Sequence, residues 1–74
     1  MRVIIVGCGK LGSGLAKALL RKGNRVTIID RDPESFDLLG ADFAGQKIVG
    51  IGFDRDILEQ AEIRRADAVI ACGK

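Results

Sequence analysis

Three glycines near the start of the chain have types and spacing that suit phosphate binding. They follow the apolar run 3–6 directly, within the stretch Gly7-Cys8-Gly9-Lys10-Leu11-Gly12. In a strand–turn–helix unit the first glycine allows a tight turn, the second lets the backbone approach a pyrophosphate, and the third lets the helix pack close to the strand. The helix N-terminus offers unpaired N–H groups to the phosphate, and Lys10 adds a full positive charge. The alternative is a tight turn that binds nothing.

An acidic residue at the end of the second apolar run shifts that balance toward a nucleotide. Asp30 follows the run 26–29, and the dinucleotide-binding fingerprint places such an acid about 20 residues after the glycines, where it accepts hydrogen bonds from ribose hydroxyls. An acid here disfavours a ribose 2′-phosphate, whereas the neighbouring Arg31 can accept one or lie flat on an adenine. The alternative for Asp30 is a solvated carboxylate at a strand end.

Two further features lie near the predicted phosphate loop. The stretch Gly50-Ile51-Gly52-Phe53-Asp54 follows the third strand and can wall the adenine, or it is a turn in which Asp54 caps the next helix; both interpretations can hold at once. Cys8 sits at a helix N-terminus, which lowers a thiol pKa and permits a redox role. Its plainer interpretation is a small residue under a tight loop. The predicted strand order brings Cys72 near Cys8, at a distance the sequence leaves open.

The strands and helices that must position these residues are indicated by two alternating spacings of apolar residues along the chain. The continuous apolar run 3–6 is typical of a strand covered on both faces, 26–29 indicates a second buried strand, and 47–49 and 68–71 indicate a short third strand and a fourth. Between them, helical spacing follows Gly9, Asp32-Pro33-Glu34 and Asp54, each a plausible helix start. The sequence therefore predicts an α/β fold: half of a Rossmann-like domain, with a four-stranded parallel sheet in the order 3-2-1-4 and helices on both faces.

Composition narrows the function classes for this single domain of 74 residues. A net charge of +2 is too small to favour nucleic acid. The absence of histidine excludes histidine-based acid–base and nucleophile chemistry, and no spacing suits a metal site. No apolar run is long enough for membrane insertion, and two cysteines fit reduced thiols in the cytoplasm. We expect no catalytic residue.

The stretches 1–36, 53–61 and 66–71 resemble the nucleotide-binding N-terminal domain of Trk-type potassium-uptake regulators and potassium-channel regulators, known as RCK or KTN domains. Particular to that family are the run Ile29-Asp30-Arg31-Asp32-Pro33 and the G-x-G-F-D of residues 50–54. The resemblance implies a non-catalytic, ligand-sensing cytoplasmic domain, peripheral to the inner face of the membrane. Such a domain binds NAD(H) or an adenine nucleotide (AMP, ADP, ATP), forms a homodimer, and passes a conformational signal to a membrane potassium transporter or channel subunit.

The resemblance also implies roles for individual residues. Gly7, Gly9, Lys10, Leu11 and Gly12 would line the phosphates, Asp30 would hold the ribose, and Arg31 would lie near the adenine. Ile51 departs from the family, which usually has an acid there, and family domains continue for roughly two more βα units. The full predicted nucleotide-contacting set is Gly7, Cys8, Gly9, Lys10, Leu11, Gly12, Asp30, Arg31, Ile51, Gly52 and Phe53.

From these features we expect binding through the AMP half of the ligand, with poor discrimination among AMP, ADP, ATP and NAD(H). The apolar fourth strand would form an edge and favour self-association. Three alternatives remain open: a fragment of an NAD-dependent oxidoreductase, an S-adenosylmethionine binder, and a structural scaffold whose site is unused.

Overall fold

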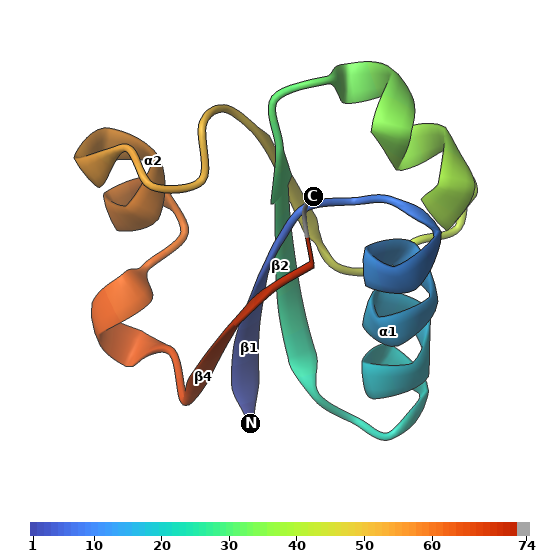
Figure 1. The fold of residues 1–74 in the computed structure, drawn as a ribbon. Helices are drawn as coiled ribbons and strands as arrows, with labels where there is room; N and C mark the ends of the chain where they lie inside the picture. Colours follow the sequence, from blue (N-terminus) through green and yellow to red (C-terminus); the bar gives the residue numbers. More distant parts are fainter. Residues whose placement is uncertain (73–74) are drawn as a thin grey trace.

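Four parallel strands form the centre of the computed structural model, which describes residues 1–72. The strands lie in the order β3-β2-β1-β4, as predicted. Strands β1 and β2 are central, so their side chains are buried on both faces, whereas β3 and β4 lie at the edges (Figure 1). The bounds are β1 Arg2–Val6, β2 Arg25–Asp30, β3 Gln46–Val49 and β4 Ala68–Ala71.

Helical segments cover both faces of the sheet, which confirms the predicted layers. On one face, α1 (Lys10–Arg21) and the 3₁₀ helix η1 (Pro33–Leu39) pack on Val3, Ile5 and Ile28. On the other, α2 (Arg55–Gln60) and the 3₁₀ helix η2 (Ile63–Arg65) pack over Ile4, Ile29 and Ile48. The two layers stand on opposite sides of the strands in Figure 1. Because alternate residues of a strand point to opposite faces, each apolar run supplies both cores.

The segment after the second strand is a 3₁₀ helix rather than the α-helix we expected. Its predicted start is confirmed: the Asp32 carboxylate accepts a hydrogen bond from Glu34 N at 3.0 Å, and Pro33 is the first helical residue. Gly40 ends it with φ 83° after seven residues. Length does not account for the tighter form, because α2 has only six residues and is α-helical. Phe36 and Leu39 are still buried against the core.

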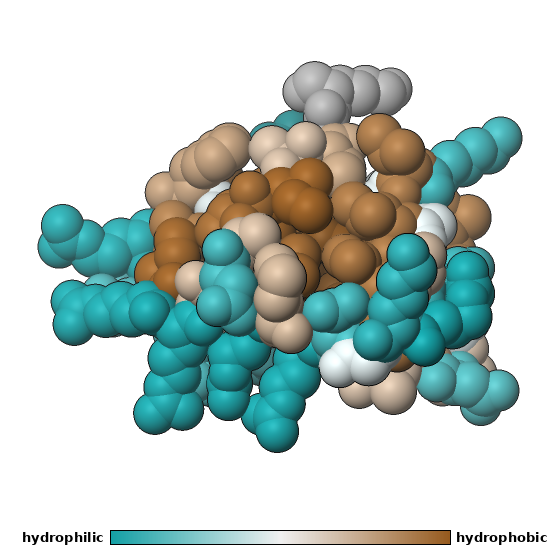
Figure 2. Space-filling model, turned by 90° about the horizontal axis from the view of Figure 1, so that it is seen from below, coloured by the Kyte–Doolittle hydropathy of each residue, from teal (hydrophilic) through white to brown (hydrophobic). Residues whose placement is uncertain are grey.

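The amino-terminal ends of the strands face the viewer in Figure 2. Apolar residues occupy the centre of that view, and long hydrophilic side chains border it on both sides and below. Edge strand β4 leaves Val69 47% exposed, whereas the corresponding positions of β1 are buried. The sheet thus has one apolar edge strand that the described residues leave partly uncovered.

Candidate nucleotide-binding site

Two glycines of the first turn are required by the fold itself. Gly7 has φ 107°, a region that only glycine enters readily, and its N–H donates to Ile29 O at 2.7 Å. A Cβ at Gly12 would overlap the carbonyl oxygen of Gly7 and lie 3.1 Å from its carbonyl carbon. These positions therefore have the predicted steric roles of a tight turn and a close helix–strand approach.

The fold places no such demand on Gly9. Its φ of −93° and ψ of −162° suit any residue, and a Cβ there would meet no atom within 4 Å. It is the N-cap of α1 and makes no side-chain capping bond. Serine, threonine or aspartate at this position would cap the helix slightly better than glycine, by about a few tenths of a kcal/mol. Glycine at this position is therefore unexplained by internal packing.

The first turn of α1, next to Gly9, has backbone N–H groups that are free to bind a ligand. The first helical bond is Ser13 N to Gly9 O at 2.9 Å. Within residues 1–72, the N–H groups of Lys10, Leu11 and Gly12 have no hydrogen-bond acceptor. The side chains of Lys10 and Leu11 are exposed. Such donors, with the helix dipole behind them, suit an anion.

Asp30 has a structural task that sequence reasoning missed. One carboxylate oxygen accepts a hydrogen bond from Cys8 N at 2.8 Å, and the other accepts one from Asp32 N at 2.9 Å. The carboxylate therefore joins the glycine loop to the turn after β2. The bond to Asp32 is an Asx-type contact two residues on, which the sequence signals weakly. A carboxylate has about four acceptor positions, so two remain for other donors.

Cys8 belongs to the core rather than to the surface of the loop. Its side chain is 1% exposed, and its thiol donates to Ser35 O at 3.3 Å. Burial, and secondarily the charge of Asp30, raises the pKa of the Cys8 thiol above its usual 9.0. The expectation of a lowered pKa at a helix N-terminus is therefore wrong, because burial removes the hydration that a thiolate needs. Cys72 packs against the same core cluster, and both thiols are free.

The loop after β3 lies beside the glycine turn. A Cβ at Gly52 would overlap the Val6 side chain, at the very end of β1. Ile51 and Phe53 are 59% and 77% exposed at that place. The Asp54 carboxylate accepts from Asp56 N at 2.8 Å, so the predicted helix cap is confirmed. The adenine wall stays a prediction.

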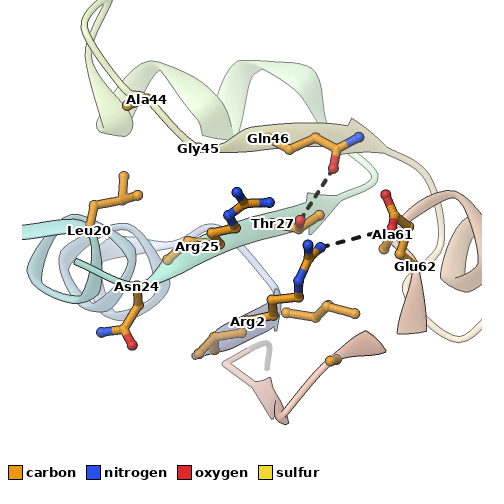
Figure 3. A pocket seen from close by; sticks show the side chains of 14 residues that line it. Arg2, Leu20, Asn24, Arg25, Thr27, Ala44, Gly45, Gln46, Ala61 and Glu62 are labelled. Atoms are coloured by element: carbon orange, nitrogen blue, oxygen red, sulfur yellow. Dashed lines mark hydrogen bonds and ion pairs between the residues drawn. The ribbon is translucent and has the colours of Figure 1, made fainter. Parts of the chain in front are cut away.

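The carboxyl ends of β1, β2 and β3 thus gather the glycine turn, Asp30, the exposed Arg31 and the loop 50–53. A separate cavity of about 350 Å³ opens at the opposite, amino-terminal end of the sheet (Figure 3). Residues 1–72 hold no cluster of histidine, cysteine or acidic side chains suited to a metal ion. In the same stretch, every helix is too short or too polar to cross a bilayer.

Comparison with known proteins agrees with this arrangement. A sequence model of the TrkA-N domain matches residues 3–74. The chain is 51% identical over 71 residues to a Trk system potassium uptake protein TrkA of Streptomyces coelicolor, covering 96% of this chain and 32% of the relative. It is 35% identical to the protein of that name from Azorhizobium caulinodans, over 96% of this chain and 16% of the relative. A TrkA homolog from Pyrococcus abyssi is also 35% identical, with 31% of its length covered. The chain therefore spans a third or less of each of these relatives.

Proposed function

We propose a function for this chain from its membership of a family: it belongs to the TrkA-N domain family. On that premise it is a non-catalytic regulatory domain that senses an adenine nucleotide. The amides of Lys10, Leu11 and Gly12 would bind the phosphates, and the side chain of Lys10 would add charge. Asp30 would accept hydrogen bonds from the ribose hydroxyls. Arg31, Ile51 and Phe53 would border the adenine.

One observation carries the proposal: Gly9 is glycine where the fold tolerates any residue. Gly7 and Gly12 are explained by backbone conformation and packing, and an empty turn needs nothing more. The missing side chain at Gly9 leaves open space in front of three free N–H groups. A phosphate bound against the backbone requires that space.

Asp30 supplies a means of sensing. The same carboxylate fixes Cys8 N in the glycine loop and Asp32 N ahead of η1. Ribose hydroxyls that donate to this carboxylate would compete with, or strengthen, those two backbone bonds. Occupation of the ribose position is thereby coupled to the phosphate loop and to the segment that carries Phe36 into the core. This coupling requires no chemical step.

The described residues supply contacts for adenosine and phosphate, so the AMP half of the ligand would dominate affinity. We expect AMP, ADP, ATP and NAD(H) to bind within about tenfold of one another, a spread of about 1.4 kcal/mol. Isothermal titration calorimetry with each nucleotide tests this. NAD binding far more tightly than AMP would contradict it.

The decisive variant is Gly9→Ala. The methyl group fits the fold but occupies the space of the phosphate, so affinity for AMP should fall by at least about tenfold. Alanine is a poorer N-cap than glycine, so the free energy of unfolding should fall by no more than about 1 kcal/mol. Gly14→Ala is the matched control, because a Cβ there also meets nothing within 4 Å yet lies further along α1. Equal AMP affinity in Gly9→Ala and Gly14→Ala would refute the proposed site.

One observation favours a second candidate, a scaffold with an unused site. The two backbone bonds of Asp30 give this acid a structural purpose without any ligand. That candidate expects no saturable binding of AMP, ADP, ATP or NAD(H) in the calorimetric experiment.

Partners follow from the family as part of the proposal. The domain would act in the cytoplasm on a membrane potassium transporter or channel subunit, and a second copy would pair with it. Edge strand β4, with Val69 half exposed, offers unpaired backbone groups for such pairing. Light scattering should show a dimer that Val69→Lys weakens; a monomer at high concentration would contradict this.

A further inference from the structure

The cavity at the amino-terminal end of the sheet has no part in the proposed nucleotide site. Its volume is about 350 Å³, the lower end of the range for small-ligand pockets, and it is open to solvent, with Arg25, Gln46 and Glu62 exposed. Arg2 of β1 and Arg25 of β2 both line this cavity, and they lie directly opposite each other in the sheet register. Figure 3 shows both guanidinium groups on the same side of the two strands, toward Gln46 and Glu62.

Two cations placed opposite each other on neighbouring strands repel, and the described residues compensate only one of them. The Glu62 carboxylate lies 3.9 Å from the Arg2 guanidinium. It is shared with Arg65, at 3.5 Å. Within residues 1–72, Arg25 has no ion pair. Because one carboxylate is shared between Arg2 and Arg65 and none pairs with Arg25, the cavity wall carries a net positive charge.

Polar groups beside the arginines are also arranged as donors. Thr27 donates its hydroxyl hydrogen to the Gln46 side-chain oxygen at 3.3 Å. That bond leaves the amide nitrogen of Gln46 free to donate. Gln46 pairs in register with Thr27 on the face that carries Arg25. The cavity wall thus combines two guanidinium forks with a neutral amide donor.

Glu62 occupies this wall in an unfavourable conformation. Its φ of 59° and ψ of 50° are left-handed, and among the described residues it is the one non-glycine with positive φ. The turn between α2 and η2 therefore holds this carboxylate beside Arg2 against the preference of its own backbone. An anion in the cavity would compete with Glu62 for the same guanidinium.

We propose that this cavity binds a small oxyanion carrying two negative charges, held by the guanidinium groups of Arg25 and Arg2 and by the amide of Gln46. Planar guanidinium forks match phosphate and carboxylate oxygens in two-point contacts. The ligand is a phosphate or a small dicarboxylate, which share this chemistry. Glu62 is the internal competitor that neutralises Arg2 when the anion is absent.

The test is an NMR titration of the ¹⁵N-labelled chain with inorganic phosphate and, separately, with succinate. We expect saturable shifts of the amides of Arg25, Thr27 and Gln46. Phosphate at the glycine turn would move the amides of residues 7–12 instead, so the two sites are read independently. Saturation by phosphate alone assigns a phosphoryl ligand, and saturation by succinate alone assigns a dicarboxylate.

Three variants sharpen the result. Arg25→Gln should weaken binding by at least about tenfold, because it removes a charged donor. Lys47→Gln removes the same charge on the opposite face of the sheet, where it pairs with Ile28, and should change affinity less than about twofold. Glu62→Gln removes the competitor and should tighten binding several-fold. Far-UV circular dichroism checks folding, and Gln46→Ala replaces Arg25→Gln if that variant is unfolded.

Any of three results would overturn the proposal. The first is that neither anion saturates the shifts at tens of millimolar. The others are equal weakening of binding by Arg25→Gln and Lys47→Gln, and weaker binding in Glu62→Gln. Equal weakening would mean a general attraction to net positive charge rather than a built site.

Discussion

Replacing Asp30 by asparagine tests the structural role of the carboxylate. Both oxygens accept backbone hydrogen bonds, from Cys8 N at 2.8 Å and from Asp32 N at 2.9 Å. Asparagine keeps one acceptor oxygen and turns its NH₂ group toward the other N–H. One charge-assisted bond is lost, and the remaining one becomes neutral.

The expected cost follows from these two bonds. A hydrogen bond to a charged group contributes about 1.5–3 kcal/mol and a neutral one about 1 kcal/mol. The bond to Asp32 is exposed, which lowers its share, so we expect a loss of about 2 kcal/mol. A chain of this length has roughly 4–11 kcal/mol of stability in total. Its melting temperature should fall by about 10 °C.

Thermal and urea unfolding followed by circular dichroism measure this loss. Asp42→Asn is the control, because it makes the same charge change at an exposed residue whose side chain makes no hydrogen bond within residues 1–72. Calorimetry on the folded variant should also show weaker AMP binding. If Asp30→Asn and Asp42→Asn unfold within about 0.5 kcal/mol of each other, the carboxylate does not hold the loop and the proposed coupling fails.

Three other perturbations follow from the geometry. Gly12→Ala should lower the free energy of unfolding in urea by about 1–3 kcal/mol, because its methyl group meets the rigid carbonyl of Gly7. Gly14→Ala should raise the free energy of unfolding by up to about 1 kcal/mol. Equal stability of the two variants would contradict the close packing at Gly12. Because the folded protein raises the Cys8 pKa, the thiol's contribution to stability is complete below its unfolded pKa near 9.0 and is lost as pH rises through the folded value. The melting temperature should therefore fall more steeply above about pH 9 in the parent than in Cys8→Ala, and parallel curves would refute this. Asp54→Ala should cost about 1 kcal/mol by removing the cap of α2, and an unchanged urea midpoint would count against it.

The arrangement of the sheet could be predicted from the sequence because its signals are local and cooperative. Strands buried on both faces need continuous apolar runs, and right-handed crossovers of helix length allow few strand orders. The glycine at position 12 and the cap at position 54 were predictable for the same reason: their tasks depend on immediate neighbours.

The features that escaped prediction depend on contacts between distant atoms. The spacing that identified Asp30 does not reveal which N–H groups its oxygens accept. Cys8 has the sequence position of a reactive thiol, and only its burial shows the opposite pKa shift. The cavity arginines come from different strands, so their pairing appears only once the register is known.

The order of the strands has a consequence for how the chain is made. Among these four strands, β1 is synthesised before the others and β4, its outer neighbour, after them; Arg2 N and the Asp67 carboxylate meet at 2.7 Å across 65 residues. Until β4 leaves the ribosome, one side of the central strand β1 is open to any extended peptide nearby. Loss of β4 docking should therefore appear first as poor yield and aggregation of newly made chains, before any change at the glycine turn.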